Sequence, residues 1–310
     1  MGLMNLKYLD RIKGALYGVA VGDALGAPVE FMSAKEIRHV HGQVCDMMSG
    51  GWLNVQPGEV TDDTQMTLAV ADGIAANPDH PVGEIGKRFI AWADGGPKDI
   101  GGTCALSIQN ARKLLLDGLE PETAWSKAGK TAAQQNHGRS GGNGALMRTA
   151  YTGLYYNGQE VIDMTADIAE MTHADEISTS LCVRYSFMIQ KFVQGEDKAG
   201  KDLFQKTYNH TKCDEYKEPT GWSMDSFRCA LHSIKNYDGF ENALIAAVNL
   251  GGDADTIGAI TGGLAGAIYG VDAIPGRWVE KLASDVCERL DYLSRVASCH
   301  YGEHSCNKQI

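Results

Sequence analysis

Apolar residues recur at helical spacing along almost the whole chain, and the alternating β-branched runs typical of strands are nearly absent. Helix-starting prolines and helix-stopping glycines divide this pattern into segments. No change in composition marks a linker, so we predict one all-helical (all-α) domain over residues 1–298, a short tail at 299–310 and a surface loop at 209–222. The predicted helices, besides two that carry glycine repeats, are 63–78, 82–97, 103–118, 121–136, 144–158, 160–173, 176–195, 223–240, 241–252 and 276–298.

Two of the predicted helices carry a glycine at every fourth position, which places the glycines in a stripe along one helix face. The stripes are Gly14, Gly18, Gly22 and Gly26 in the first helix, and Gly258, Gly262, Gly266 and Gly270 in the second. A glycine inside a helix costs roughly 0.5–1 kcal/mol relative to alanine, so eight of them need a compensating gain. Either the two stripes pack on each other, since small residues let backbones approach closely, or each meets a different neighbour. An antiparallel pair would bring Glu30 beside Asp253 and Asp255.

Acidic residues cluster just before two apolar helical runs. The first cluster is Thr61, Asp62, Asp63 and Thr64, and the second is Asp253, Asp255 and Thr256. Each cluster could cap a helix, because an Asp or Thr there accepts backbone N–H bonds. However, a cap needs one acid, two close carboxylates repel each other, and no lysine or arginine is near in sequence. A bound cation would resolve the repulsion. The ligands are oxygen atoms only, which favours Mg²⁺, Mn²⁺ or Ca²⁺ over zinc.

Composition limits the classes of function. The net charge is −11 and the sequence pI about 5.3, which disfavours a nucleic-acid-binding surface and is compatible with binding cations. Charges near the N-terminus rule out a signal-peptide pattern, and the uncharged stretch 256–271 is too short and glycine-rich for a membrane span. Eight cysteines without a C-x-x-C pair indicate reduced thiols, and we expect a soluble, cytoplasmic monomer. The tail holds Cys299, His300, Glu303, His304 and Cys306, which could bind a soft metal or form a solvated terminus.

Several motifs, taken in order from Leu6 to Val296, resemble the ADP-ribosylglycohydrolase family. They are "GALYGVAVGDALGAPVE", "TDDTQM", "GPKDIGGT", "GNGALMR", "THAD" and "GGDADTIGAITGGLAG". The resemblance implies a compact all-α bundle of orthogonal helices, with a binuclear metal site in a cleft. It also implies a glycosidase that cleaves the bond between ADP-ribose and an acceptor.

The resemblance assigns expected roles to individual residues. Two divalent ions, Mg²⁺ or Mn²⁺, would be held by Thr61, Asp62, Asp63, Asp253, Asp255 and Thr256. Asp62 and Asp255 would thereby take part in catalysis together with Glu30, a candidate acid/base or gating carboxylate, and Asp99, which would act on the scissile bond. Asp99 matches the bacterial members, whereas human-type relatives differ at that position. ADP-ribose would be bound by Asp99, His173 and, through the backbone, Gly142, Asn143 and Gly144.

Simpler interpretations of the same residues stay open at this point. The glycines at 142 and 144 could merely form a turn that starts a helix, His173 could end one, and Asp23 could be a supporting group or a cap. For function, the leading hypothesis is release of ADP-ribose from ADP-ribosylarginine on protein. Alternatives are ADP-ribosylserine, nucleic acid or a small ADP-ribosyl conjugate as substrate, a non-catalytic ADP-ribose-binding or structural relative, and a two-metal phosphodiesterase.

Overall fold

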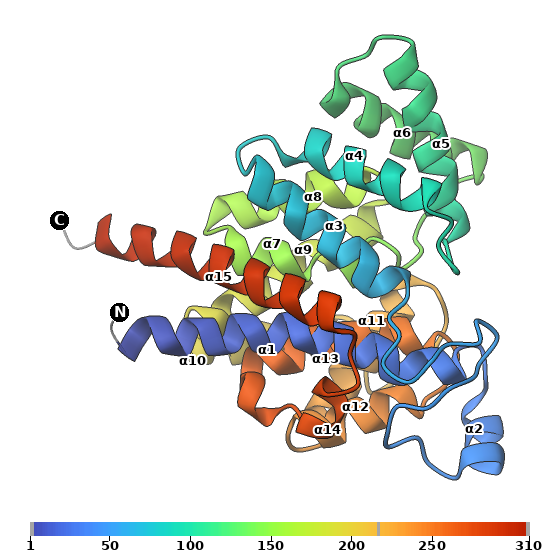
Figure 1. Cartoon of the computed structure of the whole chain (residues 1–310), viewed down its shortest axis with the longest axis vertical. Helices are drawn as coiled ribbons and strands as arrows, with labels where there is room; N and C mark the ends of the chain where they lie inside the picture. Colours follow the sequence, from blue (N-terminus) through green and yellow to red (C-terminus); the bar gives the residue numbers. More distant parts are fainter. Residues whose placement is uncertain (1–2, 216–217, 308–310) are drawn as a thin grey trace.

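The computed structural model describes residues 3–215 and 218–307, and within these ranges it contains fifteen α-helices, three short 3₁₀ helices and no β-strand (Figure 1). The predicted all-α single domain is therefore confirmed. The helices are α1 (Leu3–Gly26), α2 (Ala34–His41), α3 (Asp62–Ala76), α4 (Pro81–Asp94), α5 (Gly102–Leu116), α6 (Pro121–Gln135), α7 (Ala150–Tyr155), α8 (Gln159–Glu170), α9 (Glu176–Val193), α10 (Asp197–His210), α11 (Ser223–Asn236), α12 (Phe240–Val248), α13 (Ala254–Tyr269), α14 (Gly276–Val279) and α15 (Ser284–Asn307); the 3₁₀ helices are η1 (Ala27–Val29), η2 (Leu146–Arg148) and η3 (Val271–Ala273).

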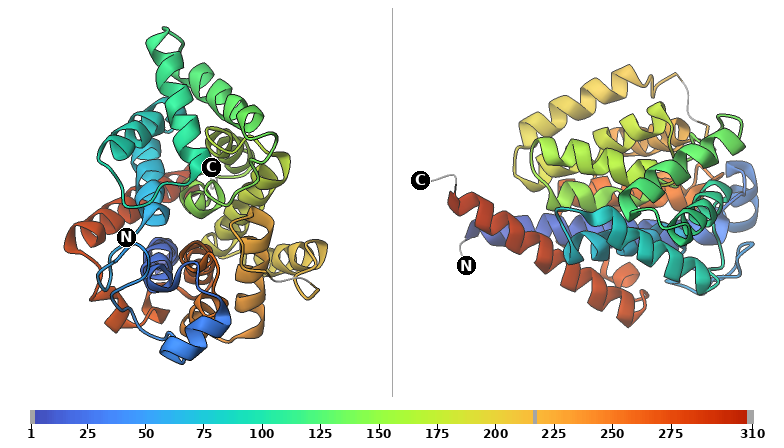
Figure 2. Two further views of the ribbon diagram at one scale, coloured as in Figure 1. Left: turned by 90° about the vertical axis from the view of Figure 1, so that its right-hand side faces the viewer. Right: turned by 90° about the horizontal axis from the view of Figure 1, so that it is seen from above.

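Helices α1 and α13 form the central pair of the fold and are seen end on, side by side, in the left view of Figure 2. They run antiparallel, with all four glycines of the α1 stripe facing α13, and Gly258, Gly262 and Gly266 of α13 facing α1. Gly270, the fourth residue of the second predicted stripe, lies just past the end of α13 with a φ of 82° and faces the Asp10 side chain. A methyl group added to Gly18 would lie 2.0 Å from the carbonyl oxygen of Gly262, and one added to Gly22 would lie 2.1 Å from that of Gly258. Only glycine leaves room for this approach. The hypothesis that the two stripes pack on each other is confirmed.

Around this pair, α3, α7, α9, α11, α12 and α15 complete the core, and α4, α5 and α6 extend it at one end (Figure 1). Helix α6 begins at Pro121, as predicted for a first-turn position, and α4 begins at Pro81, one residue before its predicted start. Asp175 caps α9 by accepting a hydrogen bond from the Ser178 N–H. Among the described helices, none combines the length and the apolar run that crossing a bilayer requires.

The structure departs from the predicted helices in four places. Helices α2 and α10 were not predicted, because α2 buries only Ile37 and α10 only three residues, too few to produce an apolar period. The segment predicted as one helix over 144–158 is split into η2 and α7, since hydroxyl groups of Thr152 and Ser186 bond to the Thr149 carbonyl there. The last predicted helix is also split, into α14 and α15.

The break between α14 and α15 has a tertiary cause. Lys281 lies in the break, and its ammonium group donates to Asp46 Oδ1 and to the Met47 carbonyl, both at 2.9 Å. The Lys281 carbonyl also lies against Gly58, where an added methyl group would be only 1.9 Å away. Helix α15 ends at Asn307, inside the predicted tail, and the domain boundary itself stays a prediction. The side chains of Glu303, His304 and Cys306 lie outside the described residues.

Candidate active site

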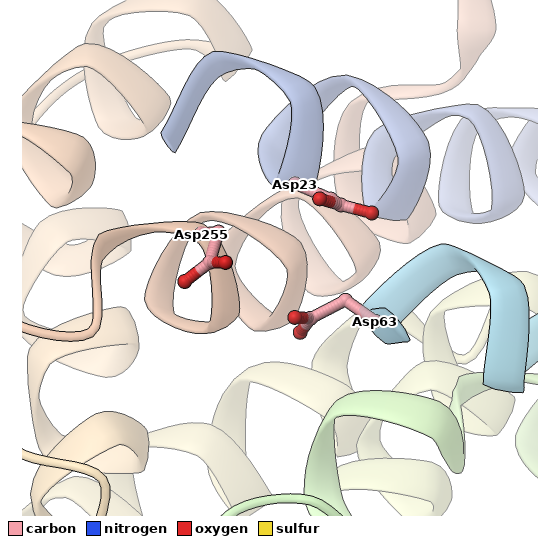
Figure 3. Close-up of side chains that lie close together, drawn as sticks. All are labelled: Asp23, Asp63 and Asp255. Carbon is pink, nitrogen blue, oxygen red and sulfur yellow. The ribbon is translucent and has the colours of Figure 1, made fainter. Parts of the chain in front are cut away.

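Three helices bring one carboxylate each to a common space (Figure 3). Asp23 comes from the end of α1, Asp63 from the first turn of α3 and Asp255 from the first turn of α13, and oxygen atoms of the three lie within 4.8 Å of one another. A second group with the same spacing consists of Glu30, Asp253 and Asp255. Asp255 belongs to both groups, so the two acidic clusters of the sequence form one continuous site. The predicted approach of Glu30 to Asp253 and Asp255 is confirmed.

Asp23 holds the start of α3 in place. Its carboxylate accepts hydrogen bonds from the Thr61 N–H at 3.0 Å and the Thr61 hydroxyl at 2.8 Å, and from the Thr64 N–H at 3.1 Å and the Thr64 hydroxyl at 2.5 Å. Burial raises the pKa of Asp23 to about 6, while these hydrogen bonds oppose the rise. The role of Asp23, which the sequence left open, is thus structural support of the acidic site. One edge of its carboxylate also faces Asp63 and Asp255.

Three of the four acids of the predicted metal motifs are buried, and all three lie among other carboxylates. Burial is the largest cause that raises the pKa of Asp62, Asp63 and Asp255 well above the usual value, and neighbouring carboxylates raise each pKa further. Asp63 Oδ2 accepts a bond from the Thr256 hydroxyl at 3.2 Å, whereas Asp63 Oδ1 is buried without a hydrogen-bond partner. An unpaired buried carboxylate oxygen is costly, and a cation is the partner that would satisfy it.

Glu30 lies beside this group at the edge of the cleft. Its Oε2 accepts a hydrogen bond of 2.6 Å from the indole N–H of Trp52. Burial raises the pKa of Glu30 to about 8; the Trp52 bond lowers it, and the charges of Asp253 and Asp99 raise it. Asp99, half-buried on the segment before α5, also has a raised pKa, mainly through burial. The structure therefore places these two candidate acid/base carboxylates at the same end of the cleft.

A cleft of about 360 Å³ opens beside the acids, within the size range of small-molecule sites, about 300–1,000 Å³. No lysine or arginine is among the residues that line it. The lining residues are Glu30, Phe31, Asp62, Asp99, Ile100, Gly101, Gly102, Thr103, Cys104, Gly142, Asn143, Gly144, Met147, His173, Gly221, Asp253, Asp255 and Thr256. All of the sequence-predicted site residues are in this set except Thr61 and Asp63, which lie behind it.

The segment Gly142–Gly144 forms another wall of the cleft and is fixed to Asp253 through Asn143. The Asn143 side chain donates to Asp253 Oδ2 at 2.7 Å and to the Ser226 hydroxyl at 2.9 Å, while its N–H donates to the Gly221 carbonyl at 3.0 Å. That N–H is already used inside the protein, so the expectation that Asn143 meets a ligand through its N–H does not fit this arrangement. An added methyl group at Gly144 would lie 3.0 Å from the His173 ring, so the glycine leaves the cleft open.

His173 is buried and neutral. Its pKa is lowered to about 3, first by burial and then by the charge of Arg148. The hydroxyl of Thr172 accepts a bond from Arg148 at 2.7 Å and lies 2.7 Å from Nδ1 of His173. The Thr172 hydroxyl can donate its proton to Nδ1 while its oxygen accepts from Arg148, and in that tautomer the ring proton is on Nε2. That nitrogen lies next to Gly142 and Gly144 on the cleft side.

Sequence reasoning missed several residues of this cleft. Gly221 belongs to the segment predicted as a surface loop, and Trp222 after it pairs with Gly142 through an isolated bridge. Trp52 and Phe31 gave no signal because each stands alone in an irregular segment. Cys104 is buried under the cleft, within 3.7 Å of the Arg148 guanidinium. All seven cysteines whose side chains the structure describes are free thiols.

Comparisons with known proteins agree with this geometry. A family model described as ADP-ribosylglycohydrolase matches residues 4–303. The ADP-ribosyl-[dinitrogen reductase] glycohydrolase of Rhodospirillum rubrum is 36% identical over 281 residues, covering 88% of this chain and 90% of that protein. The ADP-ribosylarginine hydrolase Tri1 of Serratia proteamaculans (strain 568) is 30% identical, covering 92% and 80%. A solved structure titled ADP-ribosylglycohydrolase-related protein complex superposes with a TM-score of 0.77 at 28% identity, covering 95% of this chain and 99% of that chain.

Proposed function

Since the chain belongs to the ADP-ribosylglycohydrolase family, we propose that it is a hydrolase that uses divalent cations to release ADP-ribose from ADP-ribosylated arginine side chains. The observation that carries this proposal is the pair of carboxylate groups sharing Asp255 at one end of a ligand-sized cleft. Arginine is favoured as the acceptor because relatives 30–36% identical over most of their length include proteins named ADP-ribosylarginine hydrolases.

The residues present fit hard cations. Every potential metal-ligand atom at the site is a carboxylate or hydroxyl oxygen, which suits Mg²⁺ or Mn²⁺. Asp63 Oδ1 has no hydrogen-bond partner in the protein. We propose that two ions are held by Thr61, Asp62, Asp63, Asp253, Asp255 and Thr256. When bound, such ions supply positive charge that binds and polarises vicinal ribose hydroxyls and activates water.

Carboxylate side chains of the protein would carry out the proton transfer. Hydrolysis forms a bond between a water oxygen and the anomeric carbon and breaks the bond from that carbon to the acceptor nitrogen. One proton of the water must reach the leaving nitrogen, and the other stays on the new hydroxyl group. Glu30, with a pKa near 8 and one oxygen fixed by Trp52, can hold or release a proton near neutral pH. Asp99, at the same end of the cleft, is the second candidate for this transfer.

The Gly142–Gly144 wall would orient the rest of the ligand. We propose that Gly142 and Gly144 allow the diphosphate and the distal ribose to approach the backbone closely. Neutral His173 would present its Nε2 proton to an oxygen of the same ligand, and its low pKa keeps this donor in one state across the neutral range. Asn143 would act through its bond to Asp253, which ties the glycine segment to the carboxylate site.

The test is release of free ADP-ribose from ADP-ribosylarginine and from an ADP-ribosylserine peptide, each with Mn²⁺, Mg²⁺ or chelator. The variant is Asp255→Asn, and the matched control is Asp272→Asn, an exposed aspartate on η3. We expect cation-dependent release from the arginine substrate, lost in Asp255→Asn and retained in Asp272→Asn. Release from the serine substrate alone would reassign the acceptor. Release that persists in chelator and in Asp255→Asn would refute the role of the carboxylate site.

A further inference from the structure

Two large aromatic side chains stand exposed beside the carboxylate end of the cleft. Phe31 is 66% exposed and lines the cleft, and Trp52 is 53% exposed. Their ring centroids are 5.5 Å apart at an interplanar angle of 35°. Exposed apolar rings at the rim of a polar site indicate a contact with a ligand or partner.

Phe31 is held in an unfavourable backbone conformation. Its φ of 64° lies in the left-handed region, which a bulky residue rarely adopts. The conformation is fixed by antiparallel pairing to the segment before α13: the Phe31 N–H donates to the Gly252 carbonyl at 2.6 Å, and the Gly252 N–H donates to the Met32 carbonyl at 2.7 Å. This pairing places the Phe31 backbone beside Gly252, the residue before Asp253, and both Phe31 and Asp253 line the cleft. A strained residue kept next to a reactive site points to a role in that site.

Trp52 is fixed from two sides. Its indole N–H is bound by Glu30, and its loop is tied to the Asp99 segment by Lys98, which pairs with Glu59 at 2.6 Å and lies 3.4 Å from the Asn54 carbonyl. Phe31, Glu30 and Asp99 therefore line one wall of the cleft, and Trp52 stands at the edge of this wall, in contact with Phe31 and Glu30. Trp222, a further exposed aromatic residue, lies instead beside Gly141 and Gly142, at the Gly142–Gly144 wall.

This wall combines aromatic faces with carboxylates, which is the pairing that a planar cation requires. A guanidinium group stacks on aromatic rings through its face and donates N–H bonds from its edge to carboxylates. Serine or a neutral base offers no such charge. Resting on the proposed function, in which the ribose lies over the acids, we infer that Phe31 and Trp52 form the subsite for the acceptor guanidinium and so select arginine. The step itself is unchanged, since the guanidinium leaves as a cation after gaining one proton from water.

The test compares kcat/KM for ADP-ribosylarginine with the inhibition constant of free ADP-ribose, which lacks an acceptor. The variants are Phe31→Leu, which keeps an apolar side chain but removes the ring, and Phe31→Tyr, which keeps the ring. Trp52→Leu tests the second ring, and Tyr292→Leu is the control, because Tyr292 on α15 is 54% exposed and lines no part of the cleft. Circular dichroism and the unfolding midpoint check that each variant is folded.

We expect Phe31→Leu to lower kcat/KM for ADP-ribosylarginine by about 3- to 30-fold, the range given by stacking of a cation on a ring. Trp52→Leu should also lower it, Phe31→Tyr should stay within about twofold of the wild type, and inhibition by ADP-ribose should not change in any variant. An unchanged kcat/KM in Phe31→Leu, or an equal loss in ADP-ribose affinity, overturns the acceptor subsite. Absence of release by the wild type would instead overturn the proposed function.

Discussion

Replacing Gly258 by alanine tests whether the close approach of α1 and α13 assembles the site. The added methyl group would lie 2.3 Å from the carbonyl oxygen of Gly22, and an ordinary contact begins near 3.4 Å. The two backbones must therefore separate locally by about 1 Å, because neither contacting atom belongs to a side chain that can rotate away. The change falls at the site itself, since Gly22 precedes Asp23 and Gly258 follows Asp255 by less than one turn.

Two opposing terms set the magnitude. Overpacking a core typically costs about 1–3 kcal/mol, and alanine regains roughly 0.5–1 kcal/mol of helix preference. We expect the free energy of unfolding to fall by about 2 kcal/mol, near the upper end because backbone has to move. Ligand distances at a metal site tolerate only about 0.2 Å, so a separation of this size should also lower Mn²⁺ affinity by at least about tenfold.

Urea unfolding followed by circular dichroism, in chelator and with Mn²⁺, measures both effects. Gly262→Ala is the comparison variant, since its methyl group would lie 1.9 Å from the Gly18 carbonyl oxygen, farther along the helices from Asp255. It should lose similar stability with a smaller loss of Mn²⁺ affinity. Gly276→Ala, where the nearest atom would be 3.9 Å away, should be neutral or slightly stabilising. A Gly258→Ala protein as stable as the Gly276→Ala protein would refute the reasoning.

Three further predictions concern charge at the site. Asp255→Asn should raise the unfolding midpoint in chelator, because it removes one of several repelling buried charges, and should abolish the rise that Mn²⁺ produces in the wild type. Thermal scans in both conditions measure these two effects, and a midpoint lowered in chelator would contradict the prediction. Asp23→Ala should lower the free energy of unfolding by about 2–4 kcal/mol in urea titrations, since the buried hydrogen-bond donors of Thr61 and Thr64 lose their partner. A loss under about 1 kcal/mol would show that water replaces the carboxylate as their partner. The pKa of His173 is lowered to about 3, so below pH 6.5 the unfolded chain binds a proton at this histidine while the folded protein does not, and stability is lost as the pH falls. Between pH 7.5 and 5 the free energy of unfolding should fall by about 2 kcal/mol through this group. Urea titrations of His173→Gln should therefore show a pH dependence smaller than that of the wild type by the same amount.

The arrangement of the central helices could be predicted from the sequence because two regular patterns coincide there. A glycine at every fourth position defines a helix face. Such glycines lower the stability of a helix without any gain unless another backbone packs against them. Once the two stripes pair in antiparallel fashion, the positions of Glu30, Asp253 and Asp255 follow from the sequence alone. The clustered acids gave the same location independently, because nothing positive near them in sequence could balance their charge.

The remaining contacts of the site depend on single residues in irregular segments, and no periodic pattern reports such contacts. Trp52 reaches Glu30 only through the path of the loop between α2 and α3, and Gly221 reaches the cleft through a segment whose polarity indicated a solvent-exposed loop. Helix α10 escaped prediction for a related reason, since a helix that buries three residues hardly differs in pattern from a loop. The loop at Gly221 and helix α10 were both mispredicted because burial was inferred from the polarity of the segment.

Stability and the proposed cation binding are linked in this fold through Asp23. It directly follows Gly22 of the glycine stripe of α1, and its side chain fixes the start of α3 through Thr61 and Thr64. One edge of its carboxylate also faces Asp63 and Asp255. Any movement between α1 and α13 therefore changes the position of α3 as well, and with it both ends of the carboxylate group. A ligand that binds only the closely packed arrangement must stabilise that arrangement in turn. The cost of the glycines and of the buried carboxylates would then be offset most fully with the proposed cations bound, and this helix pair would be part of the binding site as well as the centre of the fold.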